Sequence, residues 1–131
     1  MNTMEGKNIR KEALAWFRSK HSIASDEIFA SKFYTPQESW SNSRVWFFQI
    51  PLDVVNSNPV KKFHLLCQNH LEGVAFIYLR VSSLFFLKNL SSFDVDQKEK
   101  VVRIYLSAES VDMFKEVRGK GKVDFKSFIV N

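Results

Sequence analysis

RVWFFQI, residues 44–50, is the stretch that decides the fold expected for this chain. Most of its side chains are aromatic or β-branched, and apolar residues occupy both faces of an extended chain, as in a strand covered on both sides. Pro51 follows at once, and a proline has no amide hydrogen to donate to a neighbouring strand. The stretch therefore predicts a buried interior strand that ends near residue 50.

Three other stretches have a similar composition: 62–68 (KFHLLCQ), 74–81 (VAFIYLRV) and 101–106 (VVRIYL). Residues 69–73 carry turn-forming side chains, so the first two stretches predict a hairpin with a five-residue loop. We expect 44–50 to join this hairpin in an antiparallel three-strand meander, with 101–106 as a later strand beside it.

Helix-capping residues precede several of the remaining segments. Asn8 can cap an amphipathic helix that runs to about residue 20, and Ser25, Asp26 and Glu27 suit the start of a shorter helix through residue 33. Ser82 or Ser83 can cap a short helix over 84–90, followed by a polar loop over 91–100.

The last third of the chain predicts one more helix. Ser107 or Ser110 can cap it, it extends to residue 117, and Gly119 ends it. Residues 123–130 fit either a short terminal helix or an edge strand.

Length and composition favour one core. A chain of 131 residues is of single-domain size, and 13 Phe, 3 Trp and 3 Tyr supply large rings to fill that core. We expect one α+β domain over residues 1–131, with residues 1–7 as a flexible terminus. Its mostly antiparallel sheet of four to five strands packs against the N-terminal helix and the 107–117 helix.

Cysteine usage and hydropathy indicate the compartment. Cys67 is the only cysteine, so the chain has no intramolecular disulfide. Residues 1–10 contain no apolar signal segment, and no apolar run reaches the length of a membrane span, about 18 residues. We expect a cytoplasmic protein that does not enter the membrane.

The formal net charge of +5 favours anionic partners. The densest cationic tract comprises Lys115, Arg118, Lys120, Lys122 and Lys126. Its RGKGK centre places cations on a flexible backbone that could approach phosphates, although the spacing is not that of a P-loop. The alternative interpretation is the basic C-terminus of a helix with a glycine cap.

A second basic group lies in the N-terminal helix. It comprises Arg10, Lys11, Arg18 and Lys20. Trp40 lies in a polar predicted loop, where it either stacks on a partner or folds inward as an anchor.

His64, Cys67 and His70 have an H-x2-C-x2-H spacing. Residues three apart on a strand point to opposite faces, so His64 and Cys67 would diverge. We therefore expect no metal or other cofactor, no catalytic residue, and a buried structural Cys67.

The order of helix, three-strand meander, helix, strand and helix resembles the core of the restriction-endonuclease-like nucleases, over the first helix and residues 44–117. The resemblance implies magnesium-dependent phosphodiester cleavage by an acid on the second strand and a carboxylate-x-lysine pair on the third. Residues 62–68 contain no acid, and 74–81 contain neither a carboxylate nor a lysine. No catalytic residue is therefore carried over.

Together these features predict a non-catalytic binding module whose basic surface contacts DNA, RNA or an acidic protein. The expected contact residues are Arg118, Lys120, Lys122, Arg10, Lys11, Arg18, Lys20 and Trp40. One alternative is a metal-dependent nuclease with displaced acids at Asp53 and Glu72. The other is a structural or regulatory protein that forms a homodimer through a sheet edge or an aromatic patch.

Overall fold

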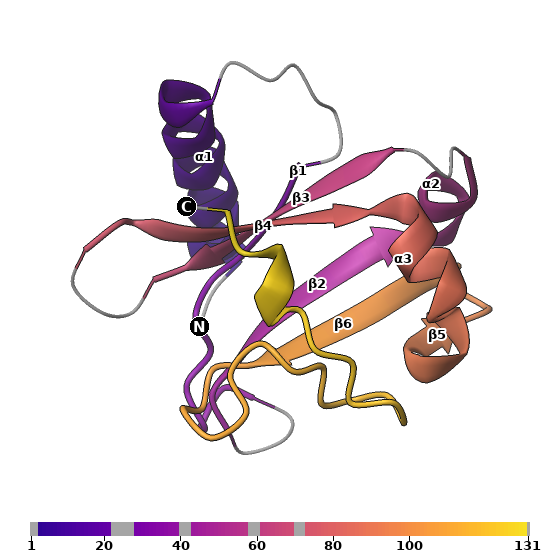
Figure 1. Cartoon of the computed structure of the whole chain (residues 1–131). Helices are drawn as coiled ribbons and strands as arrows, with labels where there is room; N and C mark the ends of the chain where they lie inside the picture. The colour runs from indigo at the N-terminus through magenta and orange to yellow at the C-terminus, as the bar shows by residue number, and fades with distance from the viewer. Residues whose placement is uncertain (1–2, 22–27, 40–42, 58–60, 70–72, 131) are drawn as a thin grey trace.

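Two three-stranded sheets packed face to face form the centre of the computed structural model (Figure 1). The structure describes residues 3–21, 28–39, 43–57, 61–69 and 73–130. Helix α1 (Thr3–Lys20) covers the face of the first sheet that points away from the second sheet. The chain is a single α+β domain, as its sequence predicts.

The first sheet has the strand order β1-β3-β4. Strands β3 (Lys62–Gln68) and β4 (Phe76–Ser82) form the predicted antiparallel hairpin, with Leu65 opposite Leu79. Strand β1 (Ile28–Ser31) runs parallel to β3 on its other side. Residues 63–67 of the central strand are all buried because one face meets α1 and the other meets the second sheet.

The second sheet has the order β2-β6-β5 and is antiparallel throughout. Strands β2 (Val45–Pro51) and β6 (Val101–Ser107) confirm two predicted strands, and β5 (Asp94–Asp96) pairs with the start of β6. Trp46, Phe48 and Ile50 point into the core between the sheets. The outer face of β2 carries Phe47, which is partly exposed, and Gln49, which is exposed.

Short helices pack against the core between the two sheets. They are α2 (Leu52–Ser57), α3 (Ser83–Lys88), η1 (Leu90–Ser92) and η2 (Lys126–Phe128). The hydroxyl of Ser82 accepts a hydrogen bond from the Phe85 amide at 3.2 Å, which confirms the predicted cap of the helix after β4. The C-terminal segment lies along β4, where the Val130 amide donates to the Tyr78 carbonyl at 2.9 Å.

The predicted single sheet of four to five strands and its three-strand meander are wrong, because the described strands form two sheets of three. The 44–50 stretch pairs with β6 in the second sheet and does not join the β3–β4 hairpin. An apolar strand can bury its side chains beside any apolar neighbouring strand. Composition therefore did not specify which strand pairs with 44–50. The helix–meander–helix–strand–helix order behind the nuclease resemblance is therefore absent.

The predicted 107–117 helix is also wrong, because this segment is a series of turns that folds back on β6. The Ser107 amide donates to the Lys115 carbonyl and the Val117 amide donates to the Tyr105 carbonyl, each in the manner of strand pairing. Phe114 has a φ of 69° and stacks on Trp46, with ring centroids 5.0 Å apart. Burial of this ring in the shared core outweighs the local helix signal.

Four other segments differ from the sequence prediction. The segment expected to be helical through residue 33 contains β1, because pairing with β3 buries Ile28. Helix α1 begins at Thr3 rather than near Asn8, and the loop expected at 91–100 contains β5. Residues 123–130 form bridges at Asp124 and Ile129 around η2, which is neither a regular helix nor a continuous strand.

Candidate functional site

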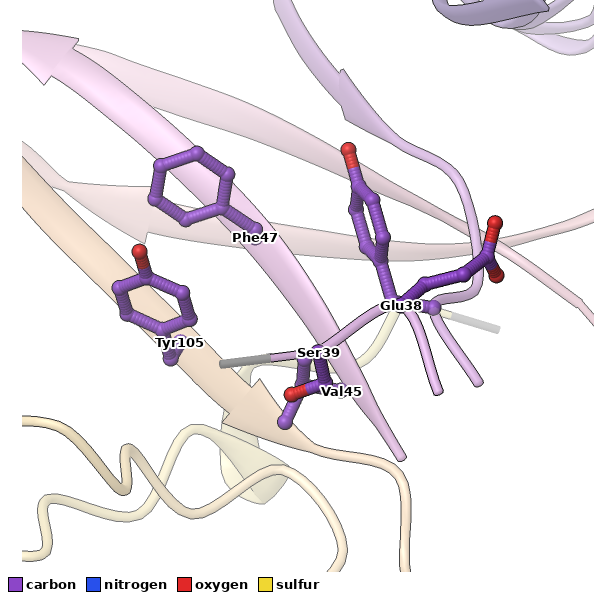
Figure 2. Close-up of a pocket in the computed structure, with 6 residues that line it drawn as sticks. Glu38, Ser39, Val45, Phe47 and Tyr105 are labelled. Atoms are coloured by element: carbon purple, nitrogen blue, oxygen red, sulfur yellow. The ribbon is translucent and has the colours of Figure 1, made fainter. Parts of the chain in front are cut away.

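A pocket of about 210 Å³ opens on the outer face of the second sheet. We call it the ring pocket. Its lining residues are Tyr34, Glu38, Ser39, Val45, Phe47 and Tyr105. Figure 2 shows Phe47 of β2 and Tyr105 of β6 side by side. They are cross-strand partners, and their rings stack at a centroid distance of 4.4 Å with 26° between planes. Both rings are only partly buried, so the stack remains accessible from outside.

Tyr34 reaches the pocket because the chain crosses from one sheet to the other after β1. The Tyr34 amide donates to the Val45 carbonyl at 2.9 Å, and the Val45 amide donates back at 3.2 Å. Burial raises the pKa of the Tyr34 hydroxyl, and the nearby negative charge of Glu38 adds to the effect. The hydroxyl is therefore neutral at physiological pH.

A fixed ion pair forms one end of the pocket. The Lys32 Nζ lies 2.7 Å from Glu38 Oε2, and the Lys32 side chain is only 7% exposed. Glu38 Oε1 accepts from the Thr35 amide at 3.2 Å and from the Thr35 hydroxyl at 3.1 Å. The Lys32 and Thr35 hydrogen bonds lower the pKa of Glu38 to about 2. Glu38 is therefore an ionised, positioned carboxylate.

Arg118 packs against Tyr105, one of the lining rings. Its guanidinium carbon lies 5.6 Å from the centroid of the Tyr105 ring, a cation–π geometry. Its Nε lies 3.1 Å from Asp94 Oδ2, so the side chain is held between β5 and β6. The structure thus brings Arg118, a residue singled out by its sequence, to a stack that the sequence prediction missed.

Glu116 holds the backbone before Arg118 in place. It is 1% exposed. Its Oε2 accepts from the amides of Tyr105 at 2.9 Å and Arg118 at 3.2 Å, and its Oε1 accepts from the Gly119 amide at 2.7 Å. Burial raises the pKa of this carboxyl, and the three N–H donors oppose the rise. A lone acid two residues before the RGKGK run was the sequence signal for this role.

The two glycines of the RGKGK run are required by packing against η1. A Cβ on Gly119 would lie 1.9 Å from the Ser92 carbonyl oxygen, and one on Gly121 would lie 2.6 Å from the Ser92 side chain. Gly119 does not cap a helix. The close approach to Ser92 explains why side chains are absent here and fixes the path of the loop.

The remaining predicted contact residues do not gather at the ring pocket. Lys120 and Lys122 are exposed in the loop just after Arg118. Lys11 and Arg18 are exposed on α1 and, being seven residues apart, share one side of that helix. Figure 1 places α1 beyond the first sheet, on the other side of the molecule from the 118–122 loop.

Arg10 and Lys20 have different surroundings from Lys11 and Arg18. Arg10 Nη1 donates to the Ile28 carbonyl at 2.9 Å and so ties α1 to β1. Lys20 lines a separate groove at the end of α1. Trp40 lies outside the described residues.

The candidate metal and nuclease residues are also dispersed. His64 Nδ1 lies 2.5 Å from the Tyr78 hydroxyl on the α1 side of β3, whereas Cys67 is buried in the core between the sheets, as the strand alternation predicts. Asp53 lies exposed in the first turn of α2. His70 and Glu72 fall outside the described residues. Within the ranges described above, no group of three His, Cys, Asp or Glu side chains could hold a metal ion.

No helix in the described part of the chain is both long and apolar enough to cross a membrane. No protein-family model, curated protein or solved structure matches the chain.

Proposed function

We propose that this protein is a binding module for single-stranded nucleic acid and that the outer face of the second sheet is its contact surface. The observation that carries the proposal is the cluster of Tyr34, Phe47 and Tyr105 around an open pocket, with Arg118 against one of the rings. Partly exposed aromatic rings on a sheet stack with unpaired bases, whose flat faces are hidden inside a duplex.

The charges around the ring pocket support one direction of approach. Ionised Glu38 in the lining repels phosphate, whereas Arg118 beside Tyr105 attracts it, although its ion pair with Asp94 offsets part of that charge. Lys120 and Lys122 follow within four residues, so their Cα atoms lie at most about 14 Å from that of Arg118. A strand whose base enters the pocket would pass its phosphates over this loop.

The first test measures base stacking. Fluorescence anisotropy would follow binding of the purified protein to labelled 12-nucleotide single-stranded DNA and RNA, and to a duplex of the same sequence. Loss of one stacking ring costs about 1–3 kcal/mol, so Phe47→Ala should weaken single-strand binding roughly 5- to 150-fold. Leu84→Ala, at an exposed apolar position on α3, is the matched control and should leave the affinity unchanged.

The second test separates this surface from general charge attraction. Lys120→Ala/Lys122→Ala and Lys11→Ala/Arg18→Ala each remove two exposed cations, from the pocket side and the α1 side respectively. For single strands, the slope of log K against log salt concentration should fall in magnitude by about 1.4 in the first variant and stay unchanged in the second.

An equal decrease of this slope in both variants would mean that binding depends on overall positive charge and does not use the ring pocket. Absence of binding at low salt would refute the nucleic-acid proposal and leave the acidic protein partner as the function to test.

A further inference from the structure

A second hollow, independent of the ring pocket, lies where the end of α1 meets the edge of the first sheet. This hollow, the α1 groove, has a volume of about 490 Å³, within the usual range of small-molecule sites. Its walls come from three segments: the last turns of α1, the start of β4 with the residues before it, and the C-terminal segment. Its lining residues are Trp16, Lys20, His21, Val74, Phe76, Ile77, Tyr78, Ile129 and Val130.

The walls of the α1 groove are held by contacts within the chain. The Trp16 and Phe76 rings pack with centroids 5.7 Å apart, which joins α1 to β4. Ile129 pairs with Leu79, and the Val130 amide donates to the Tyr78 carbonyl at 2.9 Å, which fixes the C-terminal wall. The groove is therefore formed before any ligand arrives, which lowers the entropic cost of binding.

Apolar side chains make up most of the lining. Val74 is 57% exposed, one of three large hydrophobic side chains with high exposure among the described residues. Together with the partly exposed Trp16 and Ile129 it forms a surface that water solvates poorly and that an alkyl chain or a ring can cover.

One end of the groove is polar and cationic. The His21 ring stacks on Phe17 at 5.0 Å and meets Tyr78 edge-on at 4.9 Å and Trp16 edge-on at 6.4 Å, so three rings set its position. Lys20 is the only formally charged side chain among the described lining residues. Its full positive charge exceeds the partial negative charge at the C-terminus of α1, so this end favours an anion.

We propose that the α1 groove binds a small amphipathic carboxylate, with its apolar body on Trp16, Val74 and Ile129 and its carboxylate at Lys20. One ammonium group balances one carboxylate, and the apolar wall excludes ligands that are charged along their whole length. The proposal does not depend on nucleic-acid binding, because the ring pocket shares no residue with this groove.

Isothermal titration calorimetry with sodium octanoate tests the proposal. Octanoate should bind saturably, and Lys20→Met, which keeps the apolar stem and removes the ammonium, should weaken binding about tenfold. Lys11→Met, on the exposed side of the same helix, should not change it. Octan-1-ol should bind wild type and Lys20→Met equally, because the alcohol has no negative charge to pair with the Lys20 ammonium group.

A second pair of variants tests the location. Val74→Glu introduces a carboxylate at an exposed position of the groove and should weaken octanoate binding, whereas Leu84→Glu, exposed on α3, should not. No saturable binding of octanoate at millimolar concentration would overturn the proposal. Equal effects of Lys20→Met and Lys11→Met, or of the two glutamate variants, would overturn it as well.

Discussion

Replacement of the buried Glu116 by glutamine should destabilise the fold although the two side chains have nearly the same shape. The carboxylate accepts three backbone hydrogen bonds, two at Oε2 and one at Oε1. A glutamine side chain offers one oxygen and one NH₂ group. With the amide oxygen in the Oε2 position, the Gly119 amide would face another donor at a site that is shielded from water.

The magnitude follows from the number of donors left without an acceptor. One unsatisfied buried N–H costs about 1–3 kcal/mol, so the free energy of unfolding of Glu116→Gln should fall by that amount. Glu116→Ala removes both acceptor oxygens, leaves all three N–H donors without this partner, and should cost about 3 kcal/mol or more. Domains of this size unfold with about 5–15 kcal/mol, so the alanine variant should be close to the limit of stability.

Urea denaturation followed by tryptophan fluorescence measures both effects. We expect a lower midpoint with an unchanged m-value, because the surface exposed on unfolding stays the same. Glu99→Gln, at an exposed turn position after β5, is the matched control and should change the stability by less than about 0.5 kcal/mol. If Glu116→Gln were as stable as Glu99→Gln, the carboxylate would not organise this loop.

Three other predictions concern local features. Gly119→Ala would place its Cβ 1.9 Å from the Ser92 carbonyl oxygen and should lower the free energy of unfolding by about 1–3 kcal/mol in the same urea assay; an unchanged midpoint would contradict the close approach to η1. Cys67 is fully buried and burial raises the pKa of its thiol, so a maleimide should label it only after urea unfolds the protein, and rapid labelling of the folded state would refute this. The pKa of Glu38 is lowered to about 2, so its pairing with Lys32 stabilises the fold above the ordinary carboxyl pKa and this contribution is lost as pH falls from about 4.5 to 2. Thermal melts should therefore show Glu38→Gln less stable than wild type at pH 7 and equal to it near pH 2, and a constant difference would contradict the assignment.

The sequence predicted strands well where their pattern is strong. The stretches 44–50, 62–68, 74–81 and 101–106 all lie in or overlap strands, and the turn residues between the second and third define the hairpin that is observed. These features depend on neighbours in the sequence, so their signals are local. The burial of Cys67 on a β-strand was likewise predictable from alternation.

The errors share one physical cause, which is tertiary packing that outweighs local preference. The 107–117 segment carries capping residues and helical spacing, but the stacking of Phe114 on Trp46 holds it as turns against β6. The segment that includes β1 carries a helix-start signal, but parallel pairing with β3 buries Ile28. Neither contact is visible in a local window of sequence.

Some residues of the candidate site could also be predicted from the sequence, whereas others could not. The basic RGKGK run was visible as composition, and Arg118 does contact Tyr105, a ring of the ring pocket. Phe47 and Tyr105 were visible only as strand residues, because their contact depends on the register between β2 and β6. A shift of one residue in that register would turn one of the two rings into the core.

The sequence by itself determined the fold class, the positions of four strands, the first helix, the burial of Cys67 and the excess of positive charge. These properties follow from composition and from periodicities of a few residues. Only the tertiary structure decided that the strands divide into two sheets, that the two basic groups lie on different sides, and that Tyr34, Phe47, Tyr105 and Arg118 meet. The reason is that strand pairing joins residues far apart in the chain, and many partners satisfy the same apolar pattern.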